Sequence, residues 1–304
     1  MGSLALLFPG QGSQFVGMGR KLFEQSAAAR AVFDEADRAL GFPLSRLCFE
    51  GPEAELKATA NTQPAILTHS IAALAELRAA FPEKLAGTAF AAGHSLGEYS
   101  ACVATGALSF ADAVRLVRRR GEFMQDAVPA GEGAMAAIVG LPPEAVEAAC
   151  REAAGEEIVS AANYNSPEQT VIAGHAGAVE RACAACVAKG ARRAIPLAVS
   201  APFHSPLMRP ARERMEPLLA ATRFSDAAIP VVTNVDGLPT SRGEALREAL
   251  VRQIDSPVEW VESIRTLSRE GVDRALEIGP GNVLTGLVRR IEKGIRAEAW
   301  GGEA

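Results

Sequence analysis

The chain has 304 residues, of which 48% are hydrophobic, and a formal net charge of −5 at pH 7. This length and apolar content suit one large domain, or a large domain with a smaller companion. The mildly acidic balance argues against nucleic-acid binding, and no stretch approaches the ~20 consecutive apolar residues of a membrane span.

In the first part of the chain, short apolar strands alternate with amphipathic helices. The apolar runs predict strands at residues 4–8 and 88–92. Helical periodicity predicts helices at residues 27–40, 64–80, 96–105 and 110–127. Alternation of this kind is typical of an α/β domain built on a mostly parallel sheet.

The middle of the chain follows a different order, strand–helix–strand–strand–helix–strand, which is typical of a ferredoxin-like unit. Strands are expected at 131–141, 157–166, 169–174 and 191–197, with helices from Pro142 onward and at 176–189. The unit spans residues 128–199 and would be inserted into a larger domain formed by residues 1–127 and 200–304. The larger domain resumes with strands at 229–233 and 272–277, and with helices at 212–221, 244–254 and 282–292.

A serine lies between two glycines directly after the strand expected at 88–92. The segment 93–97 reads Gly-His-Ser-Leu-Gly, which matches the G-x-S-x-G pattern at a strand-to-helix turn. In such a turn the glycines remove Cβ atoms that would collide. The hydroxyl then lies at a helix N-terminus, where backbone N–H groups favour a developing oxyanion. The motif predicts that Ser95 is a nucleophile; the alternative is a glycine-rich helix cap in which Ser95 only caps.

A nucleophilic serine needs a base, and the sequence contains four histidines. His69 lies in an apolar helical pattern and is expected in the core. His94 should point away from the neighbouring hydroxyl, and His175 is expected as a surface cap at a strand-to-helix junction. His204 lies in an irregular segment bounded by prolines, which can present a rigid imidazole. By elimination His204 is the best candidate base.

Other features leave alternatives open. The Gly-Gln-Gly-Ser run at 10–13 is either a simple turn or a source of a backbone N–H beside the serine. Cys183 and Cys186 form a C-x-x-C pair within a helix, where two small apolar residues are expected rather than a metal or redox site. One arginine of the run 115–121 could point inward and bind an anion, although the spacing does not identify which. Taken alone, Gln253 is expected at the surface.

The N-terminus and the cysteines predict a cytoplasmic protein. The first residues, Met-Gly-Ser-Leu-Ala-Leu-Leu-Phe, lack a basic region, and their apolar run is too short for a signal peptide. The five cysteines are an odd number in a long chain, which fits a reducing compartment better than a disulfide framework.

Several motifs agree in their order along the chain. They are LLFPGQGSQ, TQPAILTHSIA, GHSLGEYSA, RGEFMQ, NYNSPEQTVIAG, FHSPLM, SPVEW and EIGPGNVLTGL. With these motifs, which cover nearly the whole chain, the sequence resembles the malonyl-CoA:acyl carrier protein transacylases. This family is related to the acyltransferase domains of fatty-acid and polyketide synthases. The resemblance implies a hydrolase-like α/β domain with an inserted ferredoxin-like domain, in agreement with the predicted elements.

The resemblance also implies roles for individual residues. It implies that Ser95 is the nucleophile and His204 the base. The backbone N–H groups of Gln11 and Leu96 would form the oxyanion hole. The backbone carbonyl of Gln253 would orient the histidine, without an aspartate.

Three further positions are implied in substrate binding. Arg120, directly before Gly-Glu-Phe-Met-Gln, would hold the malonyl carboxylate. Asn163 would be a cleft residue of the smaller domain, with a less defined role. Phe203 resembles the residue found in malonyl-selecting members of the family.

The activity implied is transfer of a malonyl group from malonyl-CoA to the phosphopantetheine thiol of acyl carrier protein, through a malonyl-serine ester. No cofactor, metal, nucleic acid or membrane is expected, and the resemblance suggests a monomer. Because the carrier protein is typically acidic, two basic clusters are candidates for docking: Lys189, Arg192 and Arg193, and Arg289, Arg290 and Lys293. The rival functions are a serine esterase with an Asp or Glu in a triad, and a non-catalytic docking module.

Overall fold

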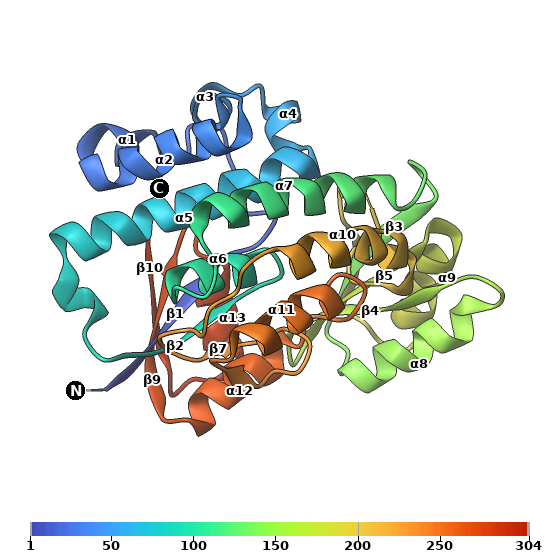
Figure 1. Ribbon diagram of the computed structural model, residues 1–304. Helices are drawn as coiled ribbons and strands as arrows, with labels where there is room; N and C mark the ends of the chain where they lie inside the picture. The colour runs from blue at the N-terminus through green and yellow to red at the C-terminus, as the bar shows by residue number, and fades with distance from the viewer. Residues whose placement is uncertain (1, 200, 303–304) are drawn as a thin grey trace.

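The computed structural model describes residues 2–199 and 201–302, and two β-sheets carry its fold (Figure 1). The larger sheet has the strand order β10-β9-β1-β2-β7-β8. Its strands are β1 (Ser3–Phe8), β2 (Thr88–Gly93), β7 (Val231–Val232), β8 (Pro239–Thr240), β9 (Val272–Ile278) and β10 (Arg296–Trp300). All its pairs are parallel except β7 with β8. The α/β class with a mostly parallel sheet is therefore confirmed.

Helices bury both faces of the larger sheet, and β1 shows why its sequence is apolar throughout. Leu4, Leu6 and Phe8 belong to one buried cluster, and Ala5 and Leu7 belong to another. Successive side chains of a strand point to opposite faces, so a strand covered on both sides needs a continuous apolar run.

The helices form a layer on each face of this sheet. The first cluster is completed by α2 (Ala27–Leu40), α5 (Thr59–Ala80), α6 (Gly97–Ala104), α7 (Phe110–Asp126), α10 (Arg209–Ala221) and α11 (Gly243–Arg252). The second is completed by α12 (Trp260–Arg269) and α13 (Val283–Ile291). The short helices α1 (Arg20–Gln25), α3 (Leu44–Glu50) and α4 (Glu53–Lys57) lie with α2 as an outer layer over α5 and α7 (Figure 1).

The smaller sheet has the order β4-β5-β3-β6, and all its neighbours are antiparallel. Its elements are β3 (Gly133–Val139), α8 (Pro143–Ala154), β4 (Val159–Ser166), β5 (Gln169–His175), α9 (Ala176–Ala188) and β6 (Arg193–Pro196). This chain order is the expected ferredoxin-like one. The boundaries at 127/128 and 199/200 stay a prediction, and residue 200, like residues 1, 303 and 304, lies outside the described residues.

Main-chain hydrogen bonds join the smaller sheet to the larger domain beside Asn163. Val258 N donates to Ala162 O at 2.9 Å, and Tyr164 N donates to Val258 O at 3.0 Å. These bonds form a parallel bridge between Asn163 of β4 and Val258, which precedes α12. The smaller sheet is therefore fixed to the larger domain at the point where a cleft residue was expected.

Some elements differ from the sequence-based expectation. Helix α5 begins at Thr59 rather than at 64, because Pro64 is tolerated inside it. Proline cannot donate to the carbonyl four residues earlier, and Arg118 Nη1 donates to that carbonyl of Ala60 instead, at 3.3 Å. Helix α12 was not predicted, and the helix ending at 291 is not the last element because β10 follows it.

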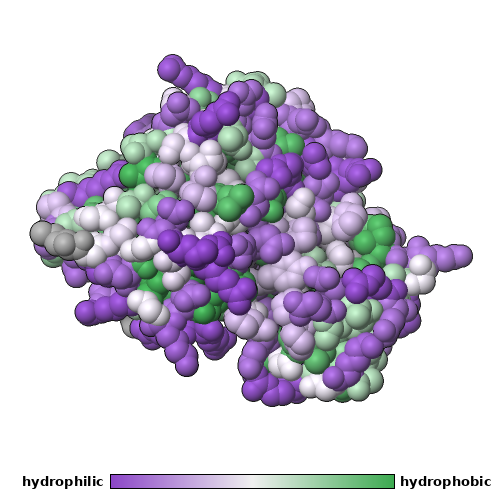
Figure 2. Space-filling model, turned by 90° about the horizontal axis from the view of Figure 1, so that it is seen from below, coloured by the Kyte–Doolittle hydropathy of each residue, from purple (hydrophilic) through white to green (hydrophobic). Residues whose placement is uncertain are grey.

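Charged and polar side chains cover most of the face drawn in Figure 2, where hydrophobic side chains form only small separate areas. Large exposed hydrophobic residues are scattered along the described chain: Val16, Phe81, Val187, Ile195, Leu238 and Val283. None of the helices within residues 2–199 and 201–302 is both long and apolar enough to cross a membrane.

Candidate active site

Ser95 lies at a sharp corner between β2 and α6. Its φ of 52° is in the left-handed region, which is rare for a residue with a side chain. A Cβ on Gly93 would lie 1.9 Å from the carbonyl carbon of Gly97, and one on Gly97 would lie 2.0 Å from Phe8 O. Both glycines of the motif are thus required by direct contact with backbone, as the sequence predicted.

The residues around the serine corner come from the carboxyl ends of three neighbouring parallel strands. Gln11 follows β1, Ser95 follows β2 and Asn234 follows β7. Ser95 N donates to Asn234 Oδ1 at 2.6 Å, and Asn234 Nδ2 donates to Gly93 O at 2.7 Å. Asn234 therefore holds the corner on both sides. Sequence reasoning missed this residue, although a polar side chain directly after a buried strand at this edge was a usable signal.

His204 lies beside Ser95 and also has a positive φ, of 57°. Its Nε2 is 2.6 Å from Ser95 Oγ, and its Nδ1 is 2.9 Å from the backbone oxygen of Gln253. Because a carbonyl oxygen only accepts, Nδ1 carries the proton and Nε2 has a free lone pair. Burial, and next the positive charge of Arg120, lower the pKa of His204 to about 3. The imidazole is therefore a neutral base aimed at the hydroxyl.

The partner of His204 decides between two arrangements. An esterase triad would place an Asp or Glu carboxylate on Nδ1, whereas this histidine contacts a backbone carbonyl. The side chain of Gln253 is fully buried, so the expectation that Gln253 lies at the surface was wrong. The residue follows α11 and is held there by its contacts with the serine corner.

Arg120 is the member of the 115–121 run that points inward, with 1% of its surface exposed. Its Nη1 donates to Gln63 Oε1 at 2.8 Å, and its Nη2 donates to Gln253 Oε1 at 2.8 Å and to Ser95 Oγ at 3.2 Å. Burial lowers its pKa. All three acceptors are neutral, so the guanidinium has hydrogen bonds but no contact with an anion among the residues that the structure describes. A buried cation of this kind fits a carboxylate-bearing ligand.

A cavity of about 380 Å³ opens over these groups. Ser95, His204 and Arg120 line its polar side, with Gln11 and Asn163 also at the wall. Its apolar wall includes Met124, Met135, Leu197, Val199 and Phe203. The cavity lies between the two sheets and has the size and mixed lining of a site for a small molecule.

Leu96 and the other three histidines lie outside the group formed by Ser95, His204 and Arg120. Leu96 is buried directly after the serine, at the start of α6. His94 points away from the hydroxyl, as expected, with its Nε2 2.8 Å from Asn165 Oδ1. His69 is buried in α5, as expected. His175 is not a side-chain cap of α9, because its Nδ1 accepts from Ile158 N at 2.9 Å instead.

The cysteine pair lies within a helix of the smaller domain. Cys183 and Cys186 lie within α9, and both are free thiols whose pKa is raised by burial. Residues 2–199 and 201–302 contain no group of three His, Cys, Asp or Glu side chains arranged to hold a metal ion.

Sequence reasoning also missed Glu98, a fully buried acid in the first turn of α6. Its Oε2 accepts from Gln253 Nε2 at 2.7 Å and from Asn234 N at 3.1 Å. Burial raises the pKa of Glu98 to about 7, against the opposite effect of these two bonds. The usable signal was that Glu98 is the one charged residue of the segment 97–104, which otherwise reads as a buried helix.

The chain is similar to known proteins over almost its whole length. The acyl transferase domain family matches residues 5–299. Malonyl CoA-acyl carrier protein transacylase of Bacillus subtilis is 51% identical over 300 residues, which cover 98% of this chain and 93% of the relative.

Solved structures agree with this match. The acyl carrier protein S-malonyltransferase of Vibrio cholerae superposes with a TM-score of 0.94 at 47% identity, covering 98% of this chain and 96% of that one. A malonyl-transacylase in complex with a type II PKS acyl-carrier protein superposes with a TM-score of 0.95 at 47% identity, covering 99% and 96%.

Proposed function

This chain belongs to the acyl transferase domain family, and we propose that it transfers a malonyl group from malonyl-CoA to acyl carrier protein. The observation that carries the proposal is the contact of Ser95 Oγ with two groups at once. A neutral imidazole lies 2.6 Å away and an unpaired buried guanidinium 3.2 Å away. The first group activates a nucleophile, and the second binds an acid-bearing acyl group beside it.

In the first half-reaction, Ser95 Oγ attacks the thioester carbonyl of malonyl-CoA while His204 Nε2 takes the hydroxyl proton. The backbone N–H groups of Gln11 and Leu96 would stabilise the oxyanion of the tetrahedral intermediate. The carbon–sulfur bond then breaks, and the imidazolium returns the proton to the leaving coenzyme A thiolate. A malonyl-serine ester remains.

In the second half-reaction, the phosphopantetheine thiol of the carrier protein takes the place of coenzyme A. His204 accepts the thiol proton, the thiolate attacks the ester carbonyl, and the proton passes to Ser95 Oγ as the ester bond breaks. The enzyme returns to its starting state, and no cofactor or metal is consumed. The same two residues serve both directions, as microscopic reversibility requires.

Arg120 would select the acyl group. The malonyl carboxylate offers the guanidinium the anionic partner that Gln63 and Gln253 do not supply. An acetyl group would leave this buried cation without an anion, so it should be transferred less well. Asn163 and Phe203 would shape the opposite wall of the cavity.

Carrier-protein docking is expected at the two basic clusters. Arg192 and Arg193 of the first cluster and Arg290 of the second line one surface groove, where Glu168 pairs with Arg192, so residues of both clusters meet in an area whose lining keeps a positive balance. Such an area would attract an acidic partner. We further propose that the enzyme acts as a cytoplasmic monomer, which sedimentation of the purified protein and cell fractionation would test.

Mass spectrometry of the intact protein after brief exposure to malonyl-CoA tests the proposal directly. We expect one malonyl adduct, which peptide mapping assigns to Ser95, and none in Ser95→Ala. Adding carrier protein should then remove the adduct and yield malonyl-carrier protein. Release of free malonate at the same rate with and without carrier protein would instead identify a hydrolase, and absence of any adduct would reject the covalent mechanism.

A further inference from the structure

Beneath the acyl site, Glu98 is a buried acid to which the proposed chemistry assigns no task. Both hydrogen bonds to its Oε2 come from neutral donors, Gln253 Nε2 and Asn234 N. Its Oε1 is buried without a hydrogen-bond partner among the described residues. Burying a carboxyl group with one unbonded oxygen lowers the folding stability, so its presence beneath the acyl site calls for a functional explanation.

One side-chain amide stands between Glu98 and Arg120. Gln253 Oε1 accepts from Arg120 Nη2 at 2.8 Å, and Gln253 Nε2 donates to Glu98 Oε2 at 2.7 Å. The guanidinium draws electrons toward the amide oxygen, and the carboxylate draws the amide protons. Both contacts therefore polarise the amide in the same sense, and each strengthens the other.

The two ends of this amide are not interchangeable. Its nitrogen donates to three oxygens of the described residues: Glu98 Oε2 at 2.7 Å, the backbone oxygen of Ser95 at 2.8 Å and Asn234 Oδ1 at 3.4 Å. On its oxygen side lies the donor Arg120. Rotation of the amide by 180° would set N–H groups against the guanidinium and an oxygen against the carboxylate. Glu98 is the strongest acceptor in the set, so it contributes most to keeping the oxygen toward Arg120.

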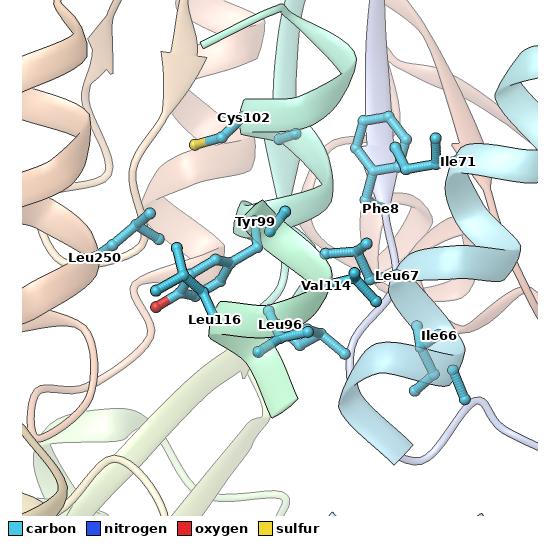
Figure 3. Packing of buried hydrophobic residues seen from close by; sticks show 14 of the residues in the cluster. Phe8, Ile66, Leu67, Ile71, Leu96, Tyr99, Cys102, Val114, Leu116 and Leu250 are labelled. Atoms are coloured by element: carbon cyan, nitrogen blue, oxygen red, sulfur yellow. The ribbon is translucent and has the colours of Figure 1, made fainter. Parts of the chain in front are cut away.

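The packing of α6 holds Glu98 in place. Leu96, Tyr99 and Cys102, which flank Glu98 along this segment, are buried, and α6 contacts both α5 and α11. Figure 3 shows Tyr99 on the side of α6 that faces Leu250, and Leu67 on the opposite side of the helix. The carboxyl is therefore presented from a helix that is packed on both sides.

Placing the anion one amide away from Arg120 has a further consequence. A carboxylate in direct contact would occupy the guanidinium donors and exclude the acyl carboxylate from them. Through the amide, the cation gains an opposing charge while its contacts stay with neutral oxygens that a substrate anion can replace.

We propose that Glu98 is a positioning residue for acyl-group selection, which acts through the Gln253 amide to hold Arg120 in the orientation that binds the malonyl carboxylate. This inference rests on the proposed function of the site. A purely structural Glu98 would support the serine corner through Asn234 and would affect all acyl groups alike.

The test compares Glu98→Ala and Glu98→Gln with the wild-type protein at pH 8, above the pKa of about 7 at which the carboxyl ionises. The measured quantity is kcat/KM for malonyl-CoA divided by kcat/KM for acetyl-CoA. We expect the ratio to fall by about 10-fold or more in Glu98→Ala, mainly through the KM for malonyl-CoA. In Glu98→Gln, which keeps an oxygen acceptor but loses the charge, we expect a fall of about 3-fold.

Glu277→Ala is the matched control. Glu277 is an equally buried acid, 1% exposed, which accepts from the backbone of Leu284 and Thr285 and does not line the cavity. This variant should lower the Tm and leave the acyl-CoA ratio at the wild-type value.

A second measurement does not depend on turnover. In a Ser95→Ala background, calorimetry should show that Glu98→Ala weakens malonyl-CoA binding about 10-fold while acetyl-CoA binding stays the same. An unchanged or increased malonyl preference in either folded Glu98 variant would overturn the inference. If the wild-type protein itself is never acylated by malonyl-CoA, the proposed function fails instead, so the two failures are distinguishable.

Discussion

The two corners that carry the reacting groups adopt the same rare backbone conformation in different ways. Ser95 has φ 52° and His204 has φ 57°. The serine corner is framed by Gly93 and Gly97, and its side chain is partly exposed. The histidine corner has no glycine beside it, and His204 is 4% exposed. Strained conformations of this type persist only where the surrounding structure enforces them.

The difference lies in what enforces each corner. The serine corner is enforced by the close approach of Gly93 to Gly97, by Phe8 of the adjacent strand, and by the two hydrogen bonds of the Asn234 side chain. The histidine corner is enforced by Ser205 Oγ, which donates to Pro202 O at 2.7 Å, and by the bond from Nδ1 to Gln253, 49 residues away. The glycine contacts of the serine corner leave a glycine spacing that can be read in the sequence, whereas the bond from His204 to Gln253 leaves no such spacing around the histidine.

Adding one methyl group to the serine corner should have the largest effect. In Gly93→Ala the new Cβ would lie 1.9 Å from backbone that cannot move aside, which should cost more than about 3 kcal/mol of folding free energy. We expect little folded protein in thermal denaturation and no malonyl adduct by mass spectrometry.

Gly286→Ala is the control for this substitution. Gly286 lies within α13 with open space around the position of a Cβ. Alanine there should stabilise the helix by up to about 1 kcal/mol and leave acylation unchanged. A Gly93→Ala variant with wild-type Tm and activity would show that the corner is not sterically required.

The same distinction explains how much of the fold was predictable. The strands at 4–8 and 88–92 were predicted correctly because a short, nearly continuous apolar run is typical of a strand that is buried on both faces. Strand β10 was missed because it lies at the edge of the sheet, where Arg296 and Glu298 interrupt its apolar positions. Strand β7 has two residues, so the prediction of a strand at 229–233 was too long.

Predictability of the site follows the same division. The residue pattern located Ser95, and elimination selected His204, but spacing could not choose among the arginines of the 115–121 run, and only the family resemblance pointed to Arg120. That choice is made by Gln63 and Gln253, which lie 57 and 133 residues from Arg120. Such pairings become visible only once the strands and helices are assembled.

Loosening the histidine corner should have a smaller effect. In Ser205→Ala the hydrogen bond across the corner to Pro202 is lost, which should cost about 1 kcal/mol of folding free energy. The imidazole would be less well aligned, so we expect the rate of acylation by malonyl-CoA to fall about 3- to 10-fold in rapid-quench measurements.

Ser263→Ala controls for the loss of a buried serine hydroxyl. Ser263 Oγ donates to Glu259 O at 2.8 Å, within α12 and outside the cavity wall. Its removal should lower the Tm by a similar amount without changing the acylation rate. Equal rates in Ser205→Ala and wild type would mean that the contact with Gln253 is sufficient to hold His204.

The smallest expected effect is that of pH, and it follows from the burial of the histidine corner. Burial and the charge of Arg120 lower the pKa of His204 to about 3, from an ordinary value of 6.5. The imidazole therefore stays neutral as the pH falls from 8 to 5, and its capacity to accept the serine proton is retained. An ordinary histidine base would lose about 10-fold in rate for each pH unit below 6.5.

The rate at which a neutral serine reagent, phenylmethanesulfonyl fluoride, modifies Ser95 isolates this effect, since the reagent has no carboxylate for Arg120. Glu98, Tyr99 and His94 are the other titratable groups packed around the pair, and the pKa of Glu98 is raised to about 7, chiefly by burial. We expect a change of less than about 2-fold between pH 8 and 5, in the wild type and in Glu98→Gln alike. A 10-fold fall per unit below pH 6.5 in both proteins would show that the histidine corner is as accessible to water as the serine corner, and the contrast between them would be lost.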